Sequence, residues 1–516
     1  MGGGGETLPE AVRKAREKVV AGARSEGILR LVTLLALTLG GAGLRLAYLF
    51  QPMVHDEAET YVYFVSRPLG EALSYYPFPN NHLLNTLLVK GSVGLFGNSP
   101  WALRLPAFIA GVLLVPAAYL AIRSLYRRDA ALLGAALVAA SSALVYFSVD
   151  ARGYTMQALI LMIAIVVGVR LLKKPKLGGW IALGILVVLG FYAVPTMLYF
   201  AAALFAWLLF EALFRDIEGD RKRFIYQLAG TAVGSAVVST LLYLPVVIRN
   251  GLHPLLQGNT APMTMSEFVN RLPRGLGTIG IEWQTGMGWA IFAVLLFFFI
   301  FALVFQSRLG EQKVSLPLVL VVVSLITMAI QHIVPYARNW LPALPLFFGA
   351  ASAGALLVLS RGIALLRKEK RTPPLATWVV ILLSVVVAVG LGAAVVVTGS
   401  AYQPAGQLRL ADADKLAAEI QKDLRPGDVV YIETNVRKPL EYYLLRRGVP
   451  LTVLYGFDGF NPPRSQVKRA LIVDVKQPAY PVSKTLKSGH LPRSDASRMV
   501  LLRNFGTSAL YEVTDP

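Results

Sequence analysis

The sequence contains no cysteine and only five histidines. The absence of cysteine excludes disulfide bonds, thiolate zinc sites and cysteine nucleophiles. Five histidines in 516 residues also leave little material for a histidine-based metal site. Charged residues make up only 16% of the chain, whereas roughly a quarter is usual in soluble proteins. The composition therefore argues against a soluble globular protein.

The sequence contains many long apolar runs. Runs of about 18 or more residues recur between residues 31 and 398, which is the length that bilayer-spanning helices require. We therefore expect a polytopic α-helical membrane protein with about eleven transmembrane helices. The expected spans cover residues 31–50, 102–122, 130–147, 154–172, 179–196, 197–214, 226–249, 286–306, 315–333, 340–360 and 376–398. Pro195 divides the stretch 179–214 because proline interrupts a helix.

Basic residues outnumber acidic residues by 50 to 30 and gather in alternate connections. The N-terminal segment 1–30 is basic, and so are the short loops near Arg123, Lys173, Arg215 and Arg367. The positive-inside bias places the N-terminus in the cytoplasm, and an odd number of spans places the C-terminal region outside. Anchoring at the inner leaflet explains the basic excess better than nucleic-acid binding does. We therefore expect a multi-pass protein of the cell (plasma) membrane with no nucleic-acid partner.

The membrane domain is expected to cover residues 31–398, with long outer loops at 51–101 and 250–285. In the first loop, "DEAETYVYFVSRPL" and "HLLNTLLVKGSVGLFG" have the amphipathic spacing of helices that lie in the interface. The second loop is rich in glycine, proline and arginine. Residues 399–516 alternate helix and strand patterns, with expected strands at "DVVYIE", "VPLTVLYG", "RALIVDV", "MVLLRNF" and "SALYEV". This pattern predicts a small extracytoplasmic α/β domain that caps the membrane domain or positions an acceptor.

The densest acidic cluster follows the first apolar run, in "MVHDEAETYVYF". Asp56, Glu57 and Glu59 lie there beside His55, on the expected outer side. One interpretation is that the acids cap an interfacial helix, because acids favour its N-terminal end. The alternative is catalytic, since a carboxylate at this place can take a proton from an acceptor hydroxyl. Neighbouring helical residues point about 100° apart, so Asp56 and Glu57 would divide the roles of base and substrate binding.

Isolated arginines occupy three outward turns: Arg104 in "WALRLPA", Arg152 in "DARGYTMQ" and Arg338 in "PYARNWLPALP". Each is either an interfacial anchor or, if the three converge, part of a site for a phosphate. Arg45 lies inside the first span, and we expect an acidic partner for it. His82 in "NNHLLN" is a candidate for orienting substrate, acid–base chemistry or metal binding.

Taken in order, these motifs resemble one family. An arginine in the first span, "HDEAETY", "NNHLLNTLL", "SPWALRLPAFIAGVLLVPAAYL", "DARGYTMQ" and "YARNWLPALPLFFGA" follow one another as in GT-C glycosyltransferases. The chain is most similar to the protein O-mannosyltransferase and aminoarabinose-transferase superfamily in its bacterial and archaeal branch. The resemblance covers residues 30–360 or so.

The resemblance implies a polyprenyl-phosphate sugar donor and transfer, with inversion, to an acceptor on the outer face. The acceptor would be a protein, a lipid or a glycan. The resemblance makes Asp56 the general base and Glu57 its companion. From their place in the outward turns, Arg152 and Arg338 are the candidates for binding the donor phosphate, with Arg104 third. The remaining substrate-binding candidates are His55, Glu59, Asn81, His82 and Tyr154.

Family members differ in their use of a divalent metal, for which Asp56, Glu57 and His82 are the candidate ligands. A lipid phosphate is already a good leaving group, so one base and a pair of cations would suffice for transfer. Two other functions stay open: a transporter or flippase of lipid-linked sugars, and a non-catalytic scaffold that binds polyprenyl lipids. A transporter would favour acids near the bilayer midplane and repeated halves, neither of which is evident here.

Overall fold

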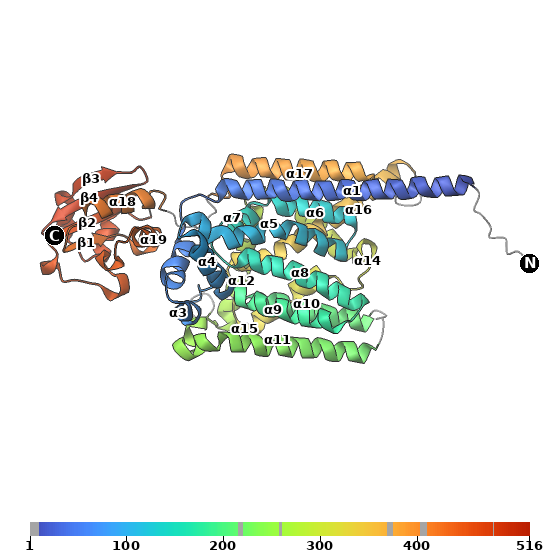
Figure 1. Ribbon diagram of the computed structural model, residues 1–516, viewed down its shortest axis with the longest axis horizontal. Helices are drawn as coiled ribbons and strands as arrows, with labels where there is room; N and C mark the ends of the chain where they lie inside the picture. The colour runs from blue at the N-terminus through green and yellow to red at the C-terminus, as the bar shows by residue number, and fades with distance from the viewer. Residues whose placement is uncertain (1–9, 215–219, 257–260, 369–374, 403–409, 478) are drawn as a thin grey trace, which may run out of the picture.

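The computed structural model describes residues 10–214, 220–256, 261–368, 375–402, 410–477 and 479–516. The first nine residues of the predicted basic N-terminus lie outside this range, as do parts of the predicted loops at Arg215 and Arg367. Residues 257–260 of the second outer loop and 403–409 of the predicted outer domain also lie outside it. Figure 1 shows a bundle of long helices with a small α/β unit at one end, and the N-terminal end of the first helix at the other.

The bundle is built from helices of 4 to 39 residues. They are α1 (Glu10–Tyr48), α5 (Pro100–Leu125), α6 (Arg128–Ala140), α7 (Ser142–Ser148), α8 (Tyr154–Lys173), α9 (Leu177–Ala193), α10 (Met197–Phe214), α11 (Arg221–Asn250), α12 (Met265–Gln284), α13 (Trp289–Val304), α14 (Gln306–Leu309), α15 (Leu316–Gln331), α16 (Leu344–Leu366) and α17 (Thr377–Thr398). A 3₁₀ helix, Ala337–Ala343, precedes α16. The first outer loop holds α2 (His55–Thr60), a π-helix (Tyr61–Val65), α3 (Leu69–Ser74) and α4 (Leu83–Phe96).

The predicted helical membrane architecture is confirmed. Among the described residues, seven helices are long and apolar enough to cross a membrane. Two further candidates are bent pairs, α6 with α7 at 59° and α12 with α13 at 111°. The other two expected spans coincide with the shorter apolar helices α9 and α15. The break expected at Pro195 is present, since α9 ends at Ala193 and α10 begins at Met197. The total of eleven spans stays a prediction.

Arg45 in α1 is fully buried, and the acidic partner expected for it is wrong. Its guanidinium donates to Ser148 Oγ at 3.0 Å, to Gly41 O at 3.0 Å and to Ala139 O at 2.9 Å. Ala139 lies where α6 ends, and the 59° bend leaves the last carbonyls of that helix without intrahelical donors. Arg45 therefore donates to a carbonyl oxygen at the end of the broken helix. These neutral acceptors take the place of an acidic partner.

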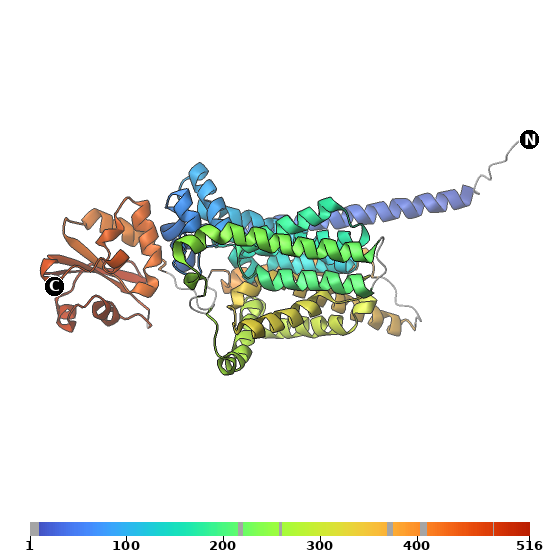
Figure 2. The same cartoon turned by 90° about the horizontal axis from the view of Figure 1, so that it is seen from below.

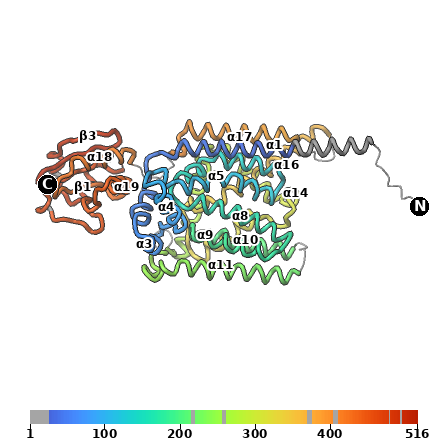
Figure 3. The backbone as a smooth tube through the Cα atoms, in the orientation of Figure 1, coloured from blue at the N-terminus to red at the C-terminus, as the bar shows by residue number. Residues whose placement is uncertain are grey.

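Helices α1 and α17, far apart in the sequence, lie side by side (Figures 1 and 3). Arg30 Nη2 donates to Thr377 Oγ1 at 2.8 Å near one end of the pair, and Tyr48 Oη donates to Val395 O at 3.1 Å near the other. Because α1 ends and α17 ends at the same face, the chain enters the first outer loop and the C-terminal unit from neighbouring points.

The second outer loop contains a helix that the sequence analysis does not predict. Helix α12 begins with a capping box, in which Thr264 Oγ1 accepts from Glu267 N at 3.3 Å and Glu267 Oε2 accepts from Thr264 N at 3.1 Å. Its glycines and Pro273 suggested a loop, but capping and an apolar face outweigh them. Figure 2 shows α12 turned away from the direction of the long helices. The expected span 286–306 shortens accordingly to α13.

The C-terminal unit is the small α/β domain that was expected. It contains α18 (Ala413–Asp423), β1 (Asp428–Tyr431), α19 (Lys438–Arg446), β2 (Arg469–Val475), α20 (Val482–Ser488), β3 (Val500–Asn504) and β4 (Ser508–Thr514). The sheet order is β1-β2-β4-β3, with β1 and β2 parallel and the other pairs antiparallel. The strand expected at "VPLTVLYG" is wrong. That segment forms a short 3₁₀ helix, Leu451–Val453, and makes one isolated bridge between Leu454 and Val430.

The C-terminal unit and the first outer loop share one hydrophobic core. Met53, Ala58 and Val62 from the loop pack in the same buried cluster as Leu440 and Tyr442 from α19. Tyr442 Oη also donates to Asn98 O at 2.5 Å. The unit is therefore docked on the acidic segment of the loop and not merely tethered after α17.

Candidate functional site

Helix α2 presents the acidic cluster. Val54 N donates to Glu57 Oε1 at 2.9 Å, which is the capping half of a capping box, and the acids lie in the first turn. An N-terminal helix end favours negative charge there. The capping interpretation is therefore correct for Glu57, and the helix turns Asp56 to a different side.

Glu57 is fully buried with Arg104. Arg104 Nε donates to Glu57 Oε2 at 2.9 Å, and Arg104 Nη2 also pairs with Glu57 Oε1. The same guanidinium donates to Leu49 O at 2.7 Å, Gln51 O at 2.6 Å and Pro52 O at 3.2 Å. All five of its N–H groups thus have protein acceptors. These contacts do not support phosphate binding by Arg104 or substrate binding by Glu57; the pair braces the chain between α1 and α2.

Asp56 lies beside the other two predicted arginines. Its Oδ2 is 3.2 Å from Nη1 of Arg338, and the two side chains are 20% and 26% exposed. Burial alone would raise the pKa of Asp56, but the charges of Arg152 and Arg338 outweigh burial and hold this pKa below its ordinary value. Asp56 is consequently an ionised carboxylate that solvent can reach.

Arg152 comes from the short turn between α7 and α8. Its Nη1 donates to Asn80 O at 3.0 Å, and its guanidinium lies 5.7 Å from the ring centre of Tyr154. Both Arg152 Nε and Arg338 Nε are buried without an acceptor among the described residues. Two orphaned guanidinium donors near one carboxylate are an arrangement that an anionic ligand would satisfy.

His82 holds this turn in place. Gly153 N donates to His82 Nδ1 at 2.8 Å, and His82 Nε2 lies 3.3 Å from Arg152 Nη2. Burial, with Arg152 and Arg338 nearby, lowers the pKa of His82 well below its ordinary value, which keeps the ring neutral. A side chain at Gly153 would come within 2.7 Å of Ala193 O, so only glycine permits this approach. Tyr154 packs edge-on against the ring at 4.8 Å.

The two asparagines before His82 have different partners from those expected. Asn81, a predicted substrate ligand, is fully buried; its amide donates to Ala72 O at 2.8 Å and accepts from Thr86 Oγ1 at 2.7 Å. These contacts fold the loop and do not support a substrate-binding role. Asn80 instead donates to Glu59. Burial and the charge of Asp56 raise the pKa of Glu59 to about 7, although Lys438 opposes them.

Asp150 is a site residue that the sequence analysis missed. It is 2% exposed, and its Oδ1 has no partner among the described residues. Burial, together with the charge of Glu57, raises the pKa of Asp150 to about 8, against the effect of Arg152. The signal was available, because Asp150 stands two residues before Arg152 in the quoted "DARGYTMQ".

Lys438 of α19 also reaches the site and was missed. Its Nζ donates to Tyr63 Oη at 2.8 Å and to Glu441 Oε2 at 3.1 Å. His55 lies on this side of α2, where burial lowers its pKa despite the charge of Asp56. The C-terminal unit therefore supplies charged side chains to the acidic cluster.

A cavity of about 190 Å³ adjoins Arg338. It lies between α7 and α12, and its lining includes Tyr146, Glu282 and Ala337. Ser142, at the bend between α6 and α7, donates there to Ser400 Oγ at 2.9 Å. The cavity thus lies between α7, α12 and the start of the 3₁₀ helix that contains Arg338.

The residues do not fit a divalent metal. Among the described residues, no three histidine, aspartate or glutamate side chains form a group that could hold one. Of the three candidate ligands, Glu57 is saturated by Arg104, and His82 Nδ1 accepts from Gly153 N.

The structure is that of a polytopic helical protein that carries an acid beside two arginines at one end of the bundle, next to a docked α/β unit. A family model for dolichyl-phosphate-mannose-protein mannosyltransferases matches residues 83–244. The structure is similar to that of ArnT from Cupriavidus metallidurans in the apo state, with a TM-score of 0.59, 13% identity, and coverage of 95% of this chain and 98% of that one. A comparison with curated protein sequences finds no match.

Two further solved structures are similar. ArnT bound to undecaprenyl phosphate has a TM-score of 0.57 at 12% identity, covering 94% of this chain and 97% of that one. The archaeal oligosaccharyltransferase AglB from Archaeoglobus fulgidus, in complex with an inhibitory peptide and a dolichol-phosphate, has a TM-score of 0.54 at 14% identity, covering 87% and 69%. The resemblance found in the motifs is thereby confirmed: the chain has the fold of the GT-C glycosyltransferase superfamily.

Proposed function

We propose that the protein transfers a sugar from a polyprenyl-phosphate donor to an acceptor hydroxyl at the end of the bundle that carries the C-terminal unit. The observation that carries this proposal is the position of ionised Asp56 between Arg152 and Arg338, whose buried Nε donors lack acceptors among the described residues. The matching mannosyltransferase segment and the lipid phosphates bound by the similar structures support the donor class.

Asp56 acts as the general base in this proposal. Its carboxylate accepts the proton of the acceptor hydroxyl while the hydroxyl oxygen attacks the anomeric carbon of the sugar. The bond between that carbon and the phosphate oxygen breaks, and its electron pair leaves with the lipid phosphate. A single displacement of this kind inverts the anomeric configuration.

Arg152 and Arg338 stabilise the charge that develops on the leaving phosphate. In the structure, Arg338 pairs with Asp56 at 3.2 Å. A donor phosphate would compete for Arg338 and thereby release the carboxylate for the acceptor. Binding of the donor would thus prepare the base. The hydrogen bond from Gly153 N to His82 Nδ1 holds the turn that carries Arg152.

The test is single-turnover transfer from a panel of radiolabelled polyprenyl-phosphate sugars to total membrane acceptors. Asp56→Asn is expected to bind the donor but to transfer sugar about 10²- to 10⁴-fold more slowly. Glu71→Gln is a matched control, because Glu71 lies in the same loop and is 41% exposed. Undiminished transfer by Asp56→Asn would contradict the base assignment.

A transporter is distinguished in the same preparations. If wild type and Asp56→Asn both move the donor across proteoliposome bilayers and neither forms product, the protein is a transporter and the proposal is wrong.

A further inference from the structure

A second, larger cavity lies at the end of the bundle opposite Asp56. Its volume is about 670 Å³, and it is formed where the ends of α5, α8 and α14 meet. Helix α5 begins close to the C-terminal unit and runs 26 residues to this end, so about 35–40 Å separate the two sites. The sugar-transfer proposal does not use this cavity.

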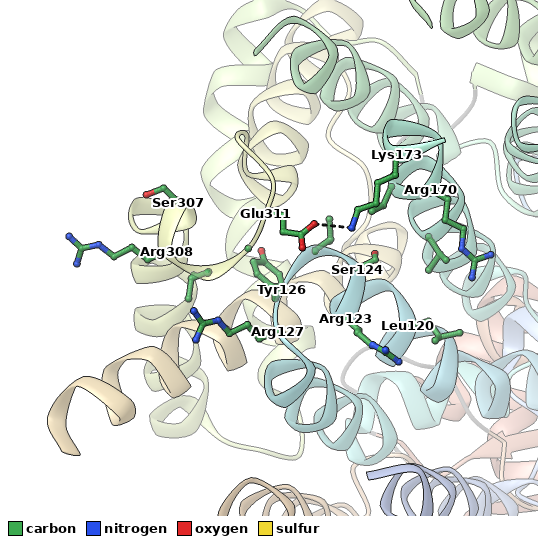
Figure 4. A pocket seen from close by; sticks show the side chains of 15 residues that line it. Leu120, Arg123, Ser124, Tyr126, Arg127, Arg170, Lys173, Ser307, Arg308 and Glu311 are labelled. Carbon is green, nitrogen blue, oxygen red and sulfur yellow. Dashed lines mark hydrogen bonds and ion pairs between the residues drawn. The ribbon is translucent and has the colours of Figure 1, made fainter. Parts of the chain in front are cut away.

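Basic side chains from all three elements surround the cavity, as Figure 4 shows. They are Arg123, Arg127, Arg170, Lys173 and Arg308. The acidic residue in the lining, Glu311, pairs with Lys173 at 2.8 Å. Within the part of the chain that the structure describes, the side chains of Arg123, Arg127 and Arg170 make no hydrogen bond or ion pair. The positive-inside bias requires only that basic residues be spread over the loops of one side. Here, by contrast, they line one cavity.

The hollow is fixed by the packing of the helix ends. Gln312 Nε2 donates to Ser124 O at 2.7 Å, which ties the chain after α14 to the end of α5. At Gly310 a side chain would come within 2.1 Å of Leu125 O, so the backbones approach there as only glycine allows. The backbone therefore holds the ends of α5 and α14 together beside the cavity.

The wall of the cavity changes from charged to apolar with depth. Leu120, Val166 and Val169 line it one turn before the basic ends of α5 and α8. Leu120 is 47% exposed, on the side of the helix that faces away from the bundle. A soluble anion would contact only the basic residues at the rim of the cavity. A phospholipid would also use the apolar wall, because methylene groups lie directly below its anionic headgroup.

We infer that this cavity binds the phosphate headgroup of an anionic phospholipid, with the start of an acyl chain against Leu120 and Val166. Guanidinium groups match phosphate oxygens in geometry and charge, and basic pockets between membrane helices are typical headgroup sites. The site holds structural lipid at the face opposite sugar transfer.

The test uses the full chain reconstituted in nanodiscs of phosphatidylglycerol and phosphatidylcholine, then extracted into detergent, with native mass spectrometry counting the retained lipids. The variant is Arg123→Gln/Arg170→Gln. The control is Lys222→Gln/Arg223→Gln, which removes the same charge from the exposed start of α11, outside the cavity. Thermal unfolding in lipid-free detergent establishes that both variants are folded.

Wild type and the control are expected to retain phosphatidylglycerol, and the cavity variant to lose on the order of 10-fold or more in affinity for it. Equal retention by all three proteins would overturn the inference. If inorganic phosphate displaces the retained lipid or raises the unfolding temperature as much as the lipid does, the site recognises a free anion and the phospholipid assignment is wrong. Because lipid retention is measured without sugar transfer, neither result depends on the proposed function.

Discussion

Asp56 and Glu57 are neighbours in the sequence, and each pairs with an arginine, but the two pairs differ in every physical respect. The Glu57–Arg104 pair has no solvent exposure, whereas the side chains of Asp56 and Arg338 are 20% and 26% exposed. Arg104 has an acceptor for each of its donors, while Nε of Arg338 has none among the described residues. A saturated pair stabilises structure; an unsaturated pair at a surface can exchange its partner for a ligand.

The largest effect on stability is expected from breaking the saturated pair. Glu57→Gln leaves the charge of Arg104 buried without a counter-charge and should cost about 3–5 kcal/mol of unfolding free energy. Chemical unfolding in detergent measures this. The double variant Glu57→Leu/Arg104→Met removes both charges and should recover much of the loss. If Glu57→Gln is as stable as wild type, the bracing role assigned to this pair is wrong.

A change at Arg152, one of the two arginines beside Asp56 whose Nε lacks an acceptor among the described residues, should alter the affinity for the donor and leave the stability almost unchanged. Arg152→Lys keeps the positive charge but removes the planar fork, so the donor Kd should rise about 10-fold or more while the unfolding midpoint stays close to that of wild type. Binding of a non-transferable polyprenyl phosphate measures the Kd. Arg249→Lys, on an exposed arginine at the same end, serves as the control. An unchanged Kd in Arg152→Lys would remove Arg152 from the phosphate site.

A smaller effect concerns pH. The raised pKa of Glu59, about 7, means that this side chain is neutral below pH 7 and charged above it. Above pH 7 its negative charge opposes the donor phosphate, so the KM for donor should rise a few-fold through neutral pH. Glu59→Gln should keep the low KM across this range, as measured by KM between pH 6 and 8. A KM that rises equally in wild type and in Glu59→Gln would assign the effect to another group.

The smallest change is expected at the C-terminal unit. Lys438 lowers the pKa of Glu59, so Lys438→Met should raise that pKa and shift the midpoint of the rise in KM to higher pH. The same pH series of KM measures this shift. Lys484→Met, an exposed lysine of the same unit, should leave the midpoint unchanged. An unshifted midpoint in Lys438→Met would mean that the unit does not influence the site.

Much of the fold could be predicted because bilayer spans leave a strong local signal. Run length and hydropathy marked apolar helices throughout the bundle, and Pro195 marked a break. Helix α12 escaped prediction because its glycines and Pro273 obscured a capping box. The strand expected at "VPLTVLYG" failed because Leu451–Val453 form a 3₁₀ turn and the segment makes only one bridge to β1.

The site was predictable in its location and only partly in its roles. Chain position predicted that Asp56 lies at one end of the bundle, but nothing local distinguishes Arg104 from Arg338. Their partners lie 47 residues away in one case and hundreds in the other. Lys438 meets Tyr63 across 375 residues and left no signal at all. Arg45 was misassigned because the bend that creates its acceptors is itself a tertiary feature.

The central claim is that Asp56 acts in the chemistry, whereas its neighbour Glu57 stabilises the structure. The most direct measurement is the single-turnover transfer rate and the unfolding midpoint of Asp56→Asn, with donor bound beforehand. We predict a rate reduced about 10²- to 10⁴-fold with a midpoint close to that of wild type. A rate close to that of wild type, with a lowered midpoint, would contradict the account, because Asp56 would then be a second structural acid.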